Sequence, residues 1–110
     1  MTVDKLTGLL GMCRRAGRLV TGFDAVVALC QTERTVVLVA ADAATRTVKE
    51  LRFRVPTQPI HRLPISKEEA ARVIGSQKPV AVLATADEGF SKALLQYVEP
   101  IEEEESHYDD

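Results

Sequence analysis

Apolar residues spaced three and four positions apart, which is the repeat of an α-helix, occur in five segments of the chain. The first predicted helix covers residues 4–16, and the second begins near Gly22 and runs to residue 30. A third follows the turn after residue 40, a fourth covers 66–74, and the last covers 86–98. Gly17, Pro56 and Gly75 are placed to end the first, third and fourth helices, and capping sequences begin the fourth at Ser66-x-x-Glu69 and the last at Thr85-x-x-Glu88.

Four apolar runs lie between these helices, at residues 19–20, 35–40, 60–63 and 79–85. The second and fourth runs are apolar almost throughout, which is typical of strands covered on both faces. The order is therefore one helix followed by strand and helix four times. This order predicts an α/β fold with a four-stranded mixed or parallel sheet sandwiched between helices.

The length and composition predict one globular domain. A chain of 110 residues with 45% hydrophobic side chains can bury a core without metal or disulfide support. The aromatic content of 5% leaves few side chains for stacking on nucleobases. Since the sequence shows neither a long apolar run nor the pattern of a signal peptide, we expect a cytoplasmic protein without a membrane partner.

Charge is distributed unevenly around the net value of −2. Residues 99–110 contain seven of the sixteen acids and no Lys or Arg, so residues 1–98 hold fourteen cations against nine acids, a net charge of +5. We therefore predict a basic domain over 1–98 and an acidic, disordered tail over 99–110. Such a tail keeps the protein in solution, shields a basic surface or binds a protein partner.

Residues suited to catalysis or metal binding are few. Cys13 and Cys30 have no metal-ligand spacing and are expected to be buried, and His61 and His107 lack a partner at a recognisable spacing. The acids after the two buried strands have local roles instead: Asp42 in the turn into the third helix, Asp87 and Glu88 at the start of the last. We expect no enzymatic activity and no cofactor or metal.

Glycine and basic residues favour nucleic-acid binding more than nucleotide hydrolysis. Gly17 and Gly22 have the spacing of half a P-loop, but Phe23 and Asp24 stand where that loop needs Lys and Ser or Thr. Helix N-termini bind phosphates through unpaired backbone amides, so residues 22–24 offer an RNA-backbone site. The basic residues in the turns around it are Arg14, Arg15, Arg18, Lys67 and Lys78.

Five segments in this order resemble a known family. They are RAGRLVTG at 15–22, LVAADAA at 38–44, SKEEAARVIG at 66–75, KPVAVL at 78–83 and ADEGFSKAL at 86–94. Together they resemble the YlxQ-type bacterial members of the ribosomal protein L7Ae superfamily, whose members bind kink-turn RNA. The resemblance covers about residues 4–98 and implies a three-layer α/β/α sandwich with a four-stranded mixed sheet.

The resemblance also implies an RNA site. Gly22 matches the glycine that lets RNA approach the amides of the second helix, Val48 suits an apolar contact to a flipped base, and Lys67 and Lys78 match basic positions. Three positions depart from the pattern of kink-turn binders: Asp24 replaces Asn, Ala25 replaces Glu and Ala28 replaces Lys. We therefore expect binding that is weaker and less specific for kink-turns.

These observations predict a monomeric, cytoplasmic, non-enzymatic protein that binds structured RNA, ribosomal or of another kind. The predicted RNA-binding residues are Arg14, Arg15, Arg18, Gly22, Phe23, Asp24, Val48, Lys67 and Lys78. The first alternative is a protein-interaction module of the same fold that has lost most RNA affinity. A small enzyme using Asp42, Asp87 or His61 is the second alternative.

Overall fold

Helices and strands alternate along residues 2–101, the part of the chain that the computed structural model describes. The helices are α1 (Thr2–Arg15), α2 (Phe23–Cys30), α3 (Thr45–Arg54), α4 (Lys67–Ile74) and α5 (Glu88–Leu95). The strands are β1 (Val20–Thr21), β2 (Val36–Val39), β3 (Ile60–Arg62), β4 (Val82–Thr85) and β5 (Glu99–Pro100). The predicted order of one helix and four strand-helix pairs is confirmed, and β5 follows it.

The sheet is mixed and has the strand order β1-β4-β2-β3-β5. Strand β4 pairs antiparallel with both β1 and β2, β3 pairs parallel with β2, and β5 pairs antiparallel with β3. The two apolar runs form the neighbouring strands β4 and β2, in which every residue is buried. The prediction of four strands was wrong, because β5 adds a fifth at one side of the sheet.

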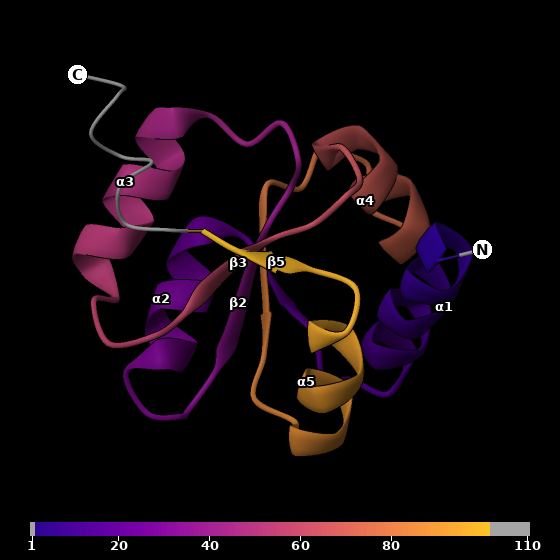
Figure 1. The fold of residues 1–110 in the computed structure, drawn as a ribbon, viewed down its shortest axis with the longest axis horizontal. Helices are drawn as coiled ribbons and strands as arrows, with labels where there is room; N and C mark the ends of the chain where they lie inside the picture. Colours follow the sequence, from indigo (N-terminus) through magenta and orange to yellow (C-terminus); the bar gives the residue numbers. More distant parts are fainter. Residues whose placement is uncertain (1, 102–110) are drawn as a thin grey trace.

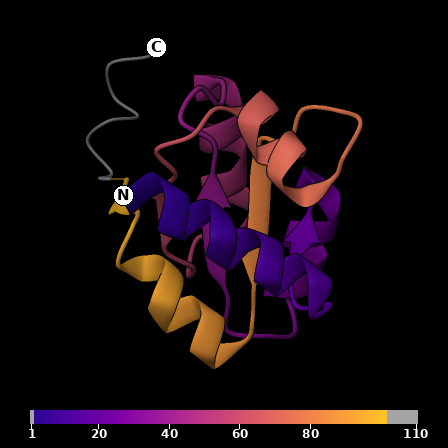
Figure 2. The ribbon, with the colours of Figure 1, turned by 90° about the vertical axis from the view of Figure 1, so that its right-hand side faces the viewer.

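Side chains that alternate along β2 enter two separate hydrophobic clusters. Val36 and Leu38 pack with residues of α1, α4 and α5, whereas Val37 and Val39 pack with residues of α2 and α3. Figure 1 shows α2 and α3 on one side of the sheet and the other three helices on the opposite side. Figure 2 looks onto that second group, with α1 and α5 lying across the strands.

The predicted helix ends are largely confirmed. Gly17 has a positive φ of 72° two residues after α1 ends, and Gly75 adopts the left-handed conformation, with φ 78°, directly after α4. Ser66 caps α4, since its hydroxyl accepts a hydrogen bond from the Glu69 amide at 3.0 Å. The predicted cap at Thr85 was wrong: Asp87 caps α5 by accepting from the Phe90 amide at 2.9 Å, and the Thr85 hydroxyl accepts from the Asp87 amide instead.

The first three residues of the predicted acidic tail are part of the fold. Glu99 and Pro100 form β5 beside β3. Ile101 is buried, its amide donates to the Ile60 carbonyl at 3.0 Å, and Arg52 Nη2 donates to its carbonyl at 3.0 Å. The predicted disorder of residues 102–110, and His107 with it, lies outside the described residues. Within the described part of the chain, no helix is both long and apolar enough to cross a membrane.

Candidate functional site

Three helices begin at the same end of the sheet. Strands β1 and β2 both run antiparallel to β4, and β3 runs parallel to β2, so all three end together where β4 begins. Helices α2, α3 and α4 follow these strands and start there, at what we call the α2–α4 end. The opposite end, where β4 finishes and α5 starts, is the α5 end. Open α/β sheets place binding sites where helices follow the carboxyl ends of strands.

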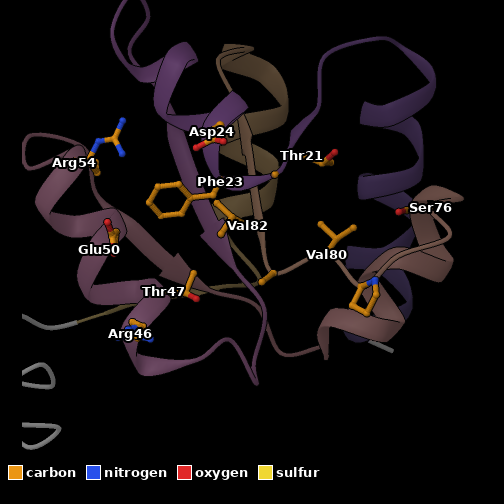
Figure 3. A pocket seen from close by; sticks show the side chains of 13 residues that line it. Thr21, Phe23, Asp24, Arg46, Thr47, Glu50, Arg54, Ser76, Val80 and Val82 are labelled. Atoms are coloured by element: carbon orange, nitrogen blue, oxygen red, sulfur yellow. The ribbon is translucent and has the colours of Figure 1, made fainter.

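A groove of about 720 Å³ opens at the α2–α4 end. Helix α3 forms one wall, the loop between α4 and β4 forms the other, and the start of α2 lies between them (Figure 3). The ring of Phe23 reaches from α2 toward α3 in this view. The residues that line the groove are 21–24, Arg46, Thr47, Glu50, Arg54, Ser76 and 79–82.

Two helix N-termini at this end lack a side-chain cap. The N-cap residues of α2 and α3 are Gly22 and Ala44, and neither helix has a capping hydrogen bond from a side chain. Helices α4 and α5 are capped by Ser66 and Asp87. Uncapped first-turn amides remain donors for an external acceptor and carry the positive end of the helix dipole. The α2–α4 end therefore holds two helix starts whose first-turn amides receive no side-chain cap, and Asp24 stands in the first turn of α2.

Gly22 contributes to the site through its backbone conformation, because its own amide already has a hydrogen-bond partner. The Gly22 amide donates to the Val82 carbonyl at 2.9 Å, which ties the start of α2 to β4. Its backbone has φ 98° and ψ 146°, a conformation that favours glycine, and an added Cβ would meet no atom within 4 Å. No other part of the protein therefore fills the space beside the Gly22 Cα.

Charges of both signs line the groove. Arg46 and Arg54 stand on the wall formed by α3, one helix turn on either side of Glu50, and Asp24 lines the groove from α2 (Figure 3). The Arg54 guanidinium lies 6.0 Å from the centroid of the Phe23 ring, at the outer limit of a cation–π contact.

Further cations surround the groove. The Lys67 carbonyl accepts from the Val80 amide at 3.0 Å, which places Lys67 beside the groove floor. Lys78 lies on the rim, where its amide donates to the Ser76 hydroxyl at 3.2 Å. Arg62 Nη1 donates to the Ala40 and Ala41 carbonyls in the turn before α3. The acids Asp42, Glu68 and Glu69 lie at the same end as these three cations.

The structure separates two groups of predicted site residues from the groove. Val48 is 7% exposed and packs in the core between α3 and the sheet. Arg14 and Arg15 end α1, and Arg18 Nε lies 3.9 Å from an oxygen of Asp87, at the α5 end. Gly22, Phe23, Asp24, Lys67 and Lys78 are brought together at the α2–α4 end.

The residues weighed for catalysis have structural contacts. Asp42 accepts a hydrogen bond at 2.8 Å from the Lys67 amide, so it supports the start of α4 and not, as predicted, the turn into α3. Glu88 lies 4.0 Å from Lys92 on α5. Burial lowers the pKa of His61, and its Nδ1 has no hydrogen-bond partner among the described residues. No cluster of three or more metal-ligating side chains occurs within residues 2–101.

The two cysteines differ in exposure. Cys13 is fully buried, as predicted, whereas Cys30 is only partly buried. Burial raises the pKa of both thiols, so both stay protonated and weakly reactive at neutral pH.

The sequence reasoning missed the polar face of α3. Arg46, Glu50 and Arg54 are four residues apart and so share one helical face, the opposite of the face formed by Val48, Leu51 and Val55. That spacing was visible in the sequence. Thr21 and Ser76 line the groove as well, but no local pattern distinguishes them from ordinary turn residues.

Comparison with known proteins points to one family. Residues 4–95 match the model of the ribosomal protein L7Ae/L30e/S12e/Gadd45 family. The chain is 32% identical over 102 residues to a protein of Enterococcus faecium named RNA-binding protein YlxQ, covering 87% of this chain and 93% of that one. It is 28% identical over 95 residues to the protein of the same name from Bacillus subtilis strain 168, covering 83% and 92%.

A solved structure shares this fold. The structure of a protein of unknown function from Bacillus halodurans C superposes with a TM-score of 0.73 at 30% sequence identity. The match covers 84% of this chain and 94% of that one.

Proposed function

The chain belongs to the ribosomal protein L7Ae/L30e/S12e/Gadd45 family, as a YlxQ-type member, and on this premise we propose that it binds structured RNA without catalysing a reaction. The proposed site is the groove together with Lys67, Lys78 and Arg62. Relatives from two bacteria carry the name RNA-binding protein, which supports this proposal.

The observation that carries the proposal is the pair of uncapped helix starts beside basic side chains. Residues of the first turns of α2 and α3 line the same groove, and the neighbouring cations lie at its wall and rim. A phosphate diester accepts hydrogen bonds and carries one negative charge. Backbone amides suit the first property and the neighbouring cations suit the second, so this surface matches the RNA backbone. The glycine at the start of α2 allows the phosphate to approach closely.

Recognition of bases is proposed to be weaker than recognition of the backbone. Asp24, Ala25 and Ala28 are all exposed on α2, where kink-turn binders of the superfamily are expected to carry Asn, Glu and Lys. Alanine offers no hydrogen bond to a base, and the Asp24 carboxylate repels a nearby phosphate. We therefore propose a structured RNA, kink-turn-like or ribosomal, that is held mainly by phosphate contacts.

Replacing Lys67 and Lys78 together with alanine is expected to weaken RNA binding about tenfold, because each removes one phosphate contact. The measurement is fluorescence anisotropy with two labelled hairpins, one fully paired and one with tandem G·A pairs in an internal loop. Affinity should fall on both, and the slope of log K against log salt should become shallower by up to about 2. Arg34→Ala with Lys92→Ala removes two cations at the α5 end as the control. Equal affinities for wild type and the Lys67 and Lys78 variant would contradict the site.

Replacing Asp24 with Asn is expected to raise RNA affinity about threefold to tenfold, since it removes a negative charge beside the phosphate path and restores an amide. The same two hairpins should show a larger gain for the one with G·A pairs. Glu33→Gln, which removes a carboxylate from the α5 end, serves as the control. A loss of affinity in Asp24→Asn would mean that the carboxylate accepts a hydrogen bond from the RNA.

The alternative of a protein-interaction module of the same fold has one observation in its favour, the carboxylates of Asp24 and Glu50 within the groove. Co-purification before and after ribonuclease treatment separates the two functions. Partners that disappear with the RNA support RNA binding, whereas partners retained without RNA support the alternative.

A further inference from the structure

Phe53 is an unusually exposed aromatic side chain. It is 82% exposed on α3, whereas Phe23, Phe90 and Tyr97 are all partly buried against the core. The ring contributes nothing to the hydrophobic core, because α3 packs against the core through the opposite face of the helix.

A shallow hollow surrounds Phe53 on the outer face of α3. Its lining residues are Thr45, Arg46, Lys49, Glu50 and Phe53, and it encloses about 510 Å³. Arg46 and Glu50 line both this hollow and the groove, so the two are continuous around α3. Along the helix, Phe53 lies seven residues beyond Arg46, or about 10 Å.

We propose that Phe53 is a stacking platform for an unpaired base of the RNA whose backbone occupies the groove. This inference rests on the proposed function and extends its site to the outer face of α3. The exposed ring presents a flat apolar face, and stacking on an aromatic ring accepts every base. Arg46 and Lys49 line the hollow beside the ring against one acid, Glu50, and this net positive charge complements the phosphates that flank a stacked base. The distance of about 10 Å from Arg46 is short enough for one or two nucleotides to connect the groove to the ring.

The chain contains no tryptophan, which permits a direct test. Phe53→Trp introduces a single indole at the platform, and a base stacked on it quenches its fluorescence. The probe is the hairpin with tandem G·A pairs and unpaired nucleotides in its internal loop. Binding should quench the indole, and replacing the unpaired nucleotides by abasic sites should remove the quenching. Met12→Trp is the matched control, because Met12 is 51% exposed on α1, on the other side of the sheet, and its indole should not respond.

Phe53→Ala should weaken binding of the same hairpin about fivefold to tenfold and leave the fully paired hairpin unaffected. Thermal unfolding should be unchanged, because the ring is not packed. Three results would overturn the platform: no quenching in Phe53→Trp, quenching that survives abasic substitution, or equal losses of Phe53→Ala on both hairpins. A protein partner that resists ribonuclease and is lost in Phe53→Ala, with RNA affinity intact, would assign the ring to protein contact.

Failure of this inference is distinguishable from failure of the proposed function. If Phe53→Ala binds both hairpins as wild type does while the Lys67 and Lys78 variant loses affinity, the groove binds RNA and the platform is wrong. If wild type binds neither hairpin, both proposals fail.

Discussion

Replacing Arg46 and Arg54 together with alanine is expected to weaken the affinity for structured RNA about 100-fold at moderate salt. Both guanidiniums line the groove, one near the start of α3 and one at its end, so together they follow the wall along which the RNA backbone is proposed to run. A hydrogen bond that involves a charged group contributes about 1.5–3 kcal/mol. Losing two contacts between a guanidinium and a phosphate therefore lowers the affinity by about two orders of magnitude.

Arg14→Ala with Arg15→Ala is the matched control for this prediction. It removes the same charge from exposed positions in the last turn of α1, at the α5 end. This control loses only long-range attraction to the RNA, so its RNA affinity should fall less than about threefold, because salt screens charges beyond about 10 Å. A greater loss in the control than in the groove variant would place the RNA at the α5 end. Thermal unfolding of both variants checks that loss of the Arg54 contact with Phe23 has not unfolded the domain.

The control also tests whether basic residues that are close to Gly22 along the chain are close to it in the structure. Arg18 is only four residues before Gly22, and the sequence therefore suggested one continuous basic site. In the structure, β1 lies between them and pairs with β4, so Gly22 is held beside Val82 while Arg18 lies beside Asp87. Even a strand of two residues carries the chain from one end of the sheet toward the other.

The central part of the fold was predictable because local pattern and tertiary role agree there. The apolar runs that became β2 and β4 are buried on both faces, so their composition alone indicates their place. The glycines that end α1 and α4 adopt the left-handed conformation that their positions in the pattern indicate. In these segments, the local sequence pattern is therefore enough to predict the structure.

Contacts between distant segments were not predictable in this way. Strand β5 is Glu99–Pro100, a pair that looks like the start of an acidic tail, and its place depends on β3 and on Arg52 binding the Ile101 carbonyl. Asp42 was expected to act on the helix that follows it but reaches the Lys67 amide, 25 residues away. The groove itself depends on such contacts, because its two walls and the start of α2 between them come from separate parts of the chain.

Replacing Gly22 with alanine is expected to lower both the stability of the domain and its affinity for RNA. At φ 98° and ψ 146° the backbone lies in a region that residues with a Cβ avoid, and such strain costs about 1–3 kcal/mol of unfolding free energy. Relief of the strain would rotate the start of α2 and displace its first-turn amides, so we expect RNA affinity to fall at least about tenfold. Urea unfolding and anisotropy titration at a temperature where the variant is folded measure the two effects.

Substitutions at two other glycines distinguish the effect of backbone strain from the loss of RNA binding. Gly8→Ala lies within α1 at a residue without positive φ, where an added Cβ also meets no atom within 4 Å, and it should stabilise the domain by about 1 kcal/mol. Gly17→Ala has left-handed strain, at φ 72°, but at the end of α1 near the α5 end, so it should lose stability and keep RNA affinity. If Gly17→Ala and Gly22→Ala lost RNA affinity equally, the effect would arise from general destabilisation. A loss confined to Gly22→Ala would require the RNA to lie against the start of α2, because Gly22 itself has no side chain with which to bind it.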